Sequence, residues 1–285
     1  MIKKILSVLT VLICLWGCKA DKITIPAYIQ INDYTVKTNC PSQGTTDQKF
    51  TDMLVFANGQ SCGTFPVGKP IPVISNGATT FLIRGVVEIN GVSAVRADYE
   101  LMAGCDTVIA VTPGKVTTIK PVFKYFTDDV FRWLEDFDGN NCASASSGGS
   151  SLTNADTTSH IVSPGFNSNH CLVMRPNATI QTSYVNKTSV ISLPASGVGV
   201  YMELNYKSNV SLNVVIKGAA SGNSYGAGGV YPSVGWNKVY LDLTEEVSNL
   251  NESNGLYYLT FYASYVPGIG TNYVYVDDIK VISKQ

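Results

Sequence analysis

The chain has 285 residues, and its 20 Lys and Arg against 21 Asp and Glu leave a formal charge of −1. This mild balance argues against nucleic acid as a partner, because phosphate binding requires clustered basic residues. Charged residues make up only 14 % of the chain, and 16 tyrosines with many Gly, Asn, Thr and Val take their place. Such a composition is typical of β-proteins whose strands are joined by tight turns.

The N-terminal residues have the pattern of a secretion signal. Lys3 and Lys4 precede an uncharged, mostly apolar stretch, residues 5–16. At 1.5 Å per residue this stretch is about 18 Å long, too short to span a hydrocarbon core of about 30 Å. It predicts a signal peptide, residues 1–17, whose removal takes away two lysines and no acid and leaves a formal charge of −3.

The apolar stretch ends at Leu15-Trp16-Gly17-Cys18. This text resembles the lipobox of bacterial lipoproteins, with an aliphatic residue three positions before a cysteine and a small residue just before it. The resemblance implies that Cys18 becomes the first residue and carries acyl chains that anchor the protein to a membrane. Residues 18–22 are then a lipidated tether. We expect a lipid-anchored protein of the cell envelope, at the outer membrane, with its periplasmic or surface face left open.

Residues 23–125 alternate apolar and polar side chains in short runs, which is the period of strands. Asn-Gly pairs between the runs suit hairpins, because Asn and Gly accept positive φ at both turn positions. We expect a small immunoglobulin-like β-sandwich here. The expected strands are residues 27–31, 53–56, 81–89, 107–111 and 116–124, and the Asn-Gly turns fall at 58–59, 76–77 and 90–91.

Residues 126–285 predict a second, larger β-sandwich, so the expected fold class is all-β. A loop rich in Asn, Ser and Gly follows residue 139, and the runs after it are nearly all strand-like. The strand patterns fall at residues 181–182, 190–193, 198–206, 211–217, 236–243, 257–263 and 273–282.

Three motifs in this second part carry a family resemblance: EDFDG at 135–139, GWNKVYLDL at 235–243 and YVDDIKV at 275–281. They resemble the jelly-roll domains of carbohydrate-binding modules and of galactose-binding-like domains. The whole layout resembles uncharacterised two-domain surface lipoproteins of Bacteroidetes. The resemblance implies a jelly roll over residues 126–285, with its first and last strands side by side and with Trp133 and Trp236 in its core.

The same resemblance implies a structural Ca²⁺, since many such modules hold this ion between an acid of the first strand and an acid of the last. That places Glu135 or Asp136 with Asp278, whose oxygens suit a hard cation. The alternative is that the acids of the last strand are exposed or capping residues.

Sugars present flat C–H surfaces that stack on aromatic side chains, so the ligand-binding candidates are tyrosines in or next to expected loops. These candidates are Tyr225, Tyr231, Tyr262 and Tyr265. Buried or half-buried tyrosines are the ordinary alternative.

Catalytic motifs are missing from the sequence, so we expect no enzyme. His160 and His170 have no indicated partner, and there is no metalloprotease, nucleophile-elbow or phosphate-loop pattern. A glycosidase needs only two carboxylates. However, Glu88 and Glu203 fall in strand patterns where we expect them on the solvent side of a sheet.

Covalent modifications are also indicated. Export permits disulfides, and the first pair to consider is Cys142 with Cys171, because both fall in the second sandwich; other pairings and free thiols stay open. Asp106-Thr107-Val108 and Asp156-Thr157-Thr158 resemble the O-glycosylation motif of Bacteroidetes, which makes Thr107 and Thr157 candidate acceptors.

The preferred function is non-catalytic recognition of a glycan by the C-terminal jelly roll, with the first sandwich as a spacer above the membrane. The alternative is a structural or adhesive subunit of a cell-surface assembly that binds protein. A glycan site predicts exposed aromatic residues in a groove with nearby amides or acids. A structural subunit predicts a broad apolar patch instead.

Overall fold

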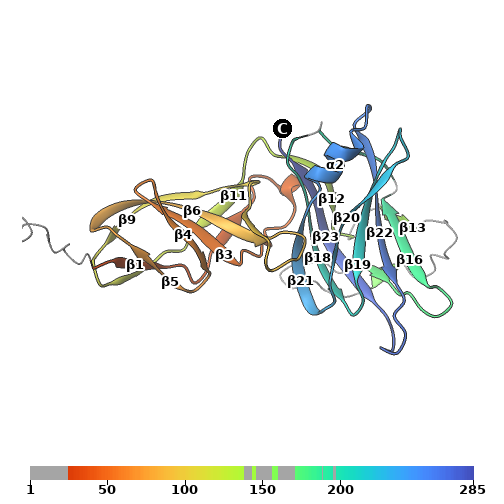
Figure 1. The fold of residues 1–285 in the computed structure, drawn as a ribbon, viewed down its shortest axis with the longest axis horizontal. Helices are drawn as coiled ribbons and strands as arrows, with labels where there is room; N and C mark the ends of the chain where they lie inside the picture. Colours follow the sequence, from red (N-terminus) through yellow and green to blue (C-terminus); the bar gives the residue numbers. More distant parts are fainter. Residues whose placement is uncertain (1–24, 138–142, 146–155, 160–170, 188, 195–196) are drawn as a thin grey trace, which may run out of the picture.

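The computed structural model describes residues 25–137, 143–145, 156–159, 171–187, 189–194 and 197–285. Figure 1 shows two β-rich lobes placed end to end, an N-terminal lobe of β1–β11 and a C-terminal lobe of β12–β23. The predicted all-β class is confirmed, whereas the immunoglobulin-like arrangement of the first lobe stays a prediction. Among the described residues, no helix is long and apolar enough to cross a membrane.

The N-terminal lobe contains three small sheets, with strand orders β10-β1-β5, β2-β11-β8 and β4-β3-β6-β7, the last with β9 also paired to β6. β1 and β2 pair in parallel with β10 and β11, so the first strands of the lobe are held by its last. The strands are β1 (Ala27–Gln30), β2 (Thr35–Lys37), β3 (Asp52–Ala57), β4 (Gln60–Pro66), β5 (Pro70–Val73), β6 (Gly77–Glu88), β7 (Arg96–Asp98), β8 (Met102–Ala103), β9 (Cys105–Val111), β10 (Val116–Thr118) and β11 (Val122–Tyr125), with the 3₁₀ turn η1 at Pro41–Gln43.

Two of the predicted Asn-Gly turns have the expected backbone. Asn58 and Gly59 join β3 to β4 with φ of 49° and 79°, and Asn90 and Gly91 follow β6 with φ of 55° and 67°. In the third pair only Gly77 has a positive φ. The first is a two-residue hairpin turn of the type that Asn-Gly favours, whereas the second lies within the longer connection, residues 89–95, between β6 and β7.

The C-terminal lobe is a sandwich of two sheets. We call the first the interface sheet, in the order β14-β15-β23-β18-β21 with β12 beside β23, and the second the outer sheet, in the order β13-β16-β22-β19-β20 with β17 beside β22. The strands are β12 (Val130–Glu135), β13 (Ala143–Ala145), β14 (Asp156–Ser159), β15 (Cys171–Met174), β16 (Thr182–Lys187), β17 (Ile191–Ser192), β18 (Val200–Ser208), β19 (Leu212–Gly218), β20 (Ser224–Val230), β21 (Ser233–Asp242), β22 (Leu256–Ser264) and β23 (Val274–Ser283).

β12 lies antiparallel to β23, with Glu135 opposite Ile279, so the first and last strands of the lobe are neighbours as the resemblance implied. The core fills the space between the two sheets and includes Trp133, as expected. The helix α2 (Thr244–Leu250) was not predicted. It has seven residues and buries Val247 and Leu250, and two turns are too few for a helical period to be recognised in the sequence.

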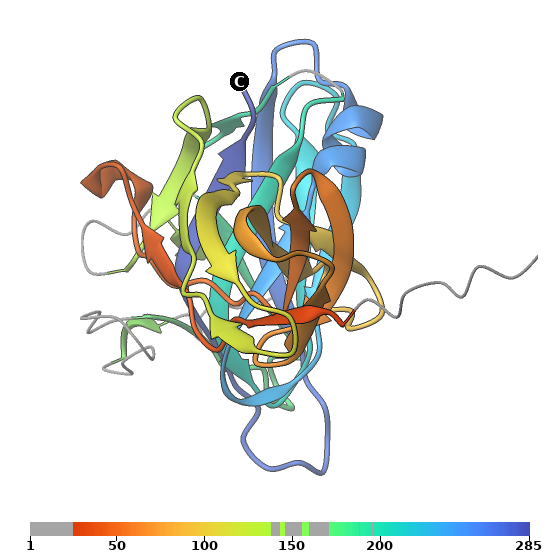
Figure 2. The ribbon, with the colours of Figure 1, turned by 90° about the vertical axis from the view of Figure 1, so that its left-hand side faces the viewer.

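The two lobes share a buried core. Tyr201, Tyr240 and Ile282 of the interface sheet belong to the hydrophobic cluster of the N-terminal lobe. The ring of Tyr99 lies 5.0 Å from the ring of Tyr240, centroid to centroid. Figure 2, which looks along the long axis, shows the N-terminal lobe covering part of the interface sheet. Buried apolar and aromatic side chains therefore join the two lobes.

Candidate functional site

Glu203 of β18 projects from the interface sheet toward the N-terminal lobe and is fully buried. Side chains of both lobes surround its carboxylate, and we call this group the Glu203 cluster. Oε1 accepts hydrogen bonds from the hydroxyls of Tyr99 (2.6 Å) and Tyr125 (2.8 Å), Oε2 accepts one from the amide of Gln48 (2.9 Å), and Oε2 lies 3.0 Å from Nζ of Lys238 and 4.0 Å from Nζ of Lys280.

These contacts decide the charge state of the cluster. Burial alone would raise the pKa of Glu203, but Lys238 and Lys280, with the hydrogen bonds from Tyr99 and Gln48, outweigh it and lower the pKa to about 2. Burial lowers the pKa of Lys280 to about 8, against the opposing effect of Glu203. The sequence placed Glu203 on the solvent side of a sheet. That prediction is wrong, because the N-terminal lobe covers this face of the sheet.

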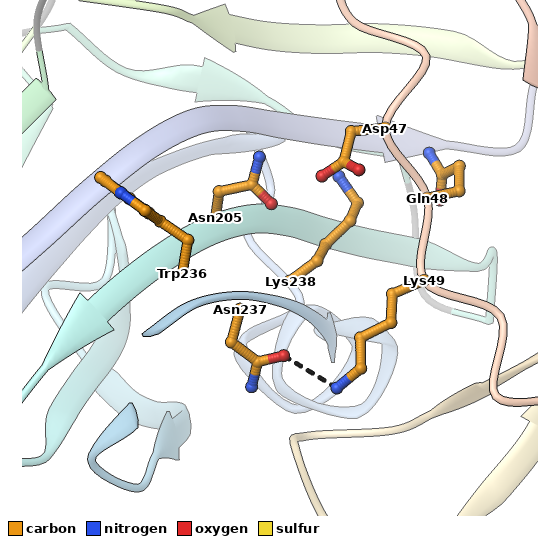
Figure 3. A pocket seen from close by; sticks show the side chains of 7 residues that line it. All are labelled: Asp47, Gln48, Lys49, Asn205, Trp236, Asn237 and Lys238. Atoms are coloured by element: carbon orange, nitrogen blue, oxygen red, sulfur yellow. Dashed lines mark hydrogen bonds between the residues drawn. The ribbon is translucent and has the colours of Figure 1, made fainter. Parts of the chain in front are cut away.

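A pocket of about 260 Å³ opens at the edge of the Glu203 cluster, where the segment between η1 and β3 crosses the interface sheet (Figure 3). Trp236 lies on one side of the pocket and Lys49 on the other. The carboxylate of Asp47 points toward the ammonium of Lys238. Both lobes therefore contribute walls, and the lining residues are Asp47, Gln48, Lys49, Asn205, Trp236, Asn237 and Lys238.

Hydrogen bonds hold the polar walls of the pocket in place. Lys49 Nζ donates to Asn237 Oδ1 at 2.8 Å, and the Asn237 amide donates to the hydroxyl of Tyr206 at 3.2 Å. On the neighbouring strand, the Asn205 amide donates to Asp278 at 3.3 Å. The pocket thus combines an aromatic face with fixed amides, a carboxylate and two ammonium groups. This set can bind a polar ligand that has one apolar face.

Trp236 is half-buried and lines the pocket, so its predicted place in the core is wrong. The alternation of side chains along β21 could have predicted the position of Trp236. Trp236 shares a strand face with Lys238 and Tyr240, whereas Val239 and Leu241 on the other face belong to the sandwich core. Because Trp236 alternates with Lys238 along the strand, it lies on the face opposite the core.

The four predicted tyrosines do not meet at one place. Tyr231 is exposed and lines another pocket, with Asn90 and Asn213. Tyr262 lies beside Tyr184 on the outer sheet, with ring centroids 5.9 Å apart, and is opposite Asn213 in the strand register. Tyr225 lies on β20, opposite the buried Ile216. Tyr265 follows β22, where its N–H donates to the carbonyl of Gln181. Their role in binding stays a prediction.

The three predicted calcium ligands do share a pocket. Glu135, Asp136 and Asp278 line a space of about 170 Å³ together with Thr45 and Lys280. Burial raises the pKa of Asp278 to about 6, against the effects of nearby lysines and the Asn205 amide. Among the described residues, however, no group of three or more His, Cys, Asp or Glu side chains is arranged to hold a metal ion, and Lys280 also lines this pocket. The calcium site at these residues stays a prediction.

The remaining predictions concern modifications and histidines. Cys171 is buried on β15, and Thr107 is half-buried on β9. Thr157 falls on β14, and its side chain is outside the described residues, as are Cys18, Cys142, His160 and His170. The lipidation, disulfide and glycosylation sites therefore stay predictions.

A carboxyl group at the connection between the lobes predicts how stability depends on pH. Asp129 lies 3.1 Å from Lys284 and accepts a hydrogen bond from the Phe126 N–H, yet burial raises its pKa to about 6. A folded-state pKa above the usual 3.8 means that the folded chain binds more protons between these values. The free energy of unfolding is therefore expected to rise as the pH falls through 6 toward 4, with Asp129 contributing about 2 kcal/mol.

Urea unfolding at pH 7.5 and at pH 4.5 measures this dependence. In Asp129→Asn, the stabilisation on acidification should shrink by that amount, while the contribution of Asp278 remains. An unchanged difference between the two pH values in the variant would contradict the assignment to Asp129.

Comparisons with known proteins give distant matches only. No protein-family model and no curated protein matches the chain. Among solved structures, the K3 adhesin domain of Lys-gingipain from Porphyromonas gingivalis w83 is 14 % identical with a TM-score of 0.38, covering 54 % of this chain and 98 % of that one. A family 29 carbohydrate-binding module mutant complexed with mannohexaose is 9 % identical with a TM-score of 0.35, covering 54 % and 92 %. Tailspike protein 4 of bacteriophage CBA120 is 11 % identical with a TM-score of 0.35, covering 54 % and 19 %. The function proposed below therefore rests on the pocket itself.

Proposed function

We propose that this chain is a lipoprotein of the cell envelope, anchored through Cys18, that binds a glycan without catalysis in the pocket between its lobes. The observation that carries the proposal is the half-buried indole of Trp236 beside the amides of Asn205 and Asn237, in a pocket open to solvent.

The chemistry of the pocket suits a sugar. A pyranose ring has a flat C–H face that stacks on an indole, while its hydroxyls exchange hydrogen bonds with amides and carboxylates. The volume of about 260 Å³ is below the roughly 300–1,000 Å³ of pockets that enclose drug-sized ligands. A single sugar unit or the end of a glycan chain therefore suits this site better than a long enclosed oligosaccharide.

The acids near the pocket favour binding over hydrolysis. A glycosidase places two carboxyl groups on either side of the bond that it cleaves. Asp47 is the one acid among the described residues that line this pocket. Glu203 lies beneath it, fully buried and paired with lysines and tyrosines, so its carboxylate is engaged in the protein.

A structural or adhesive role is the second candidate, and one observation favours it. Tyr231 and Val234 are exposed near the turn from β20 to β21, close in sequence to Trp236. An apolar contact with a protein partner would use these side chains rather than the amides of the pocket.

The test is a glycan array with the full chain, run with calcium and again with a chelator, followed by affinity measurements on any sugar that binds. Trp236→Ala is expected to weaken binding about tenfold or more, because a stacked aromatic contact of about 1.4 kcal/mol is lost. The matched control is Tyr258→Ala, which removes an exposed aromatic residue from the outer sheet.

Equal loss in both variants, or full binding by Trp236→Ala, would place the ligand elsewhere. Silence of the folded wild-type chain on the array would favour the structural role. Binding that requires calcium would support the predicted ion at Asp278.

A further inference from the structure

The free end of the N-terminal lobe is built from three neighbouring segments. Figure 1 shows β1 beginning at the end of this lobe that points away from the C-terminal lobe. Ala27 pairs with Val73 at the end of β5, and the Pro26 carbonyl accepts a hydrogen bond from the Gly114 N–H at 2.9 Å. The entry to β1, the β5–β6 connection and the β9–β10 turn therefore lie side by side. We call this surface the tip.

Three large aliphatic side chains are exposed at the tip. Ile25 is 61 % exposed, Ile74 is 70 % exposed and Val116 is 54 % exposed. Ile25 lies 3.8 Å from the position of a Cβ at Gly114, Val116 pairs with Tyr28, and Ile74 follows the residue that pairs with Ala27. Scattered apolar residues are ordinary on a surface, but neighbouring aliphatic side chains at the end of an elongated molecule indicate contact with an apolar phase.

The charge at the tip fits a lipid surface. The segments 25–32, 70–81 and 107–119 contain no Asp or Glu, while Lys115 is exposed in the β9–β10 turn. Membrane surfaces that carry anionic lipids attract basic residues by about 1 kcal/mol each and repel acidic ones. The tip can therefore approach such a surface without electrostatic cost.

The number of residues between Cys18 and Ile25 limits the distance between the tip and a membrane. Ile25 lies seven residues after Cys18. Seven residues span at most about 25 Å when fully extended. If the acyl chains at Cys18 lie in the bilayer, the tip is held within that distance of the headgroups.

We propose that the tip is a membrane-contact surface, in which Ile25, Ile74 and Val116 enter the boundary between headgroups and acyl chains next to the anchor. The proposal rests on the lipid anchor of the proposed function. It goes beyond that function by fixing the orientation of the N-terminal lobe on the membrane. A lone lipid tether leaves the protein free to tilt, whereas a tether with an adjacent apolar contact restricts its orientation. The C-terminal lobe and its pocket then face away from the membrane.

The experiment uses the full lipidated chain in vesicles of phosphatidylethanolamine and phosphatidylglycerol (3:1), with and without bromine on the acyl chains. Ile74→Trp places a fluorescent reporter in the tip, and Val234→Trp places one at an exposed position of the C-terminal lobe. Both variants keep the native Trp133 and Trp236. Brominated lipid is expected to quench about half or more of the added signal of Ile74→Trp and none of that of Val234→Trp.

Three other outcomes would contradict the membrane contact, and one of them would also contradict the anchor. If the protein floats with the vesicles but Ile74→Trp is quenched no more than Val234→Trp, the tip does not contact lipid and the anchor stands. A blue-shifted but unquenched reporter would show that a second copy covers the tip. Protein that does not float would refute the anchor and the tip together, whereas glycan binding is measured independently on the array.

Discussion

Glu203→Gln is expected to lower the free energy of unfolding by roughly 3–5 kcal/mol, the usual cost of removing one partner from a buried ion pair. The side chain of Lys238 is 2 % exposed and that of Lys280 is also 2 % exposed, so both would stay buried after losing this carboxylate. Glutamine keeps the shape of the side chain, which restricts the change to its charge. Urea denaturation measures the loss.

The matched control is Asp98→Asn, which removes one carboxylate from the surface pair of Asp98 with Arg84 (2.7 Å). Both side chains of that pair are partly exposed, so the expected loss is at most about 1 kcal/mol. Similar losses in the two variants would refute the stabilising role of the Glu203 cluster.

The Glu203 cluster also determines how the stability of the fold falls at low pH. The folded-state pKa of about 2 lies below the usual 4.5, so the stabilisation by Glu203 is complete above pH 4.5 and is lost as the pH falls toward 2. Glu203→Gln should therefore lose the part of the acid dependence that falls in this range.

The second large effect concerns the two lobes together. The whole chain is expected to unfold in one transition in calorimetry, because the lobes share a core and the Glu203 cluster. Tyr201, Tyr240 and Ile282 are buried against the N-terminal lobe. At about 1.5–3 kcal/mol for each buried side chain, their exposure would cost an amount similar to the whole stability of a typical domain. Residues 126–285 alone are expected to lose cooperative unfolding.

Phe123→Ala tests the coupling from the other side. Phe123 is fully buried in the N-terminal lobe, and its truncation should cost about 3–5 kcal/mol. Trp133 reports from the core of the C-terminal lobe. If the lobes unfold together, the Trp133 fluorescence transition of the variant moves to lower urea. Two separate transitions, with that of Trp133 unmoved, would contradict a shared folding unit.

Among the strands, β5, β15 and β20 were not predicted. Local pattern was sufficient to predict longer strands such as β6, β18 and β23 and two of the Asn-Gly turns, and the resemblance carried by short motifs implied the pairing of the first and last strands of the C-terminal lobe. These features depend on alternation, turn chemistry and a short motif, all of which are contiguous in the sequence. The helix α2 was not predicted, because its seven residues between two strands are too few to show a helical period.

The candidate site could not be predicted in the same way. Alternation assigned Glu203 correctly to the face opposite the core, but it cannot say what covers that face. Covering by the N-terminal lobe turned a surface acid into the centre of a buried cluster. It also brought Asp47 and Lys49 to Trp236, which lies about 190 residues further along the chain. Such contacts arise only from tertiary structure.

The parallel pairing of β1 with β10 and of β2 with β11 has a mechanical consequence. A molecule fastened at its N-terminus and pulled through a ligand on its far lobe is loaded along its long axis, from the entry of β1 to the exit of β11 (Figure 1). In this geometry the two strands of each pair slide past one another, so their hydrogen bonds share the force and must break together. The N-terminal lobe is thus arranged to resist tension rather than to unzip under flow.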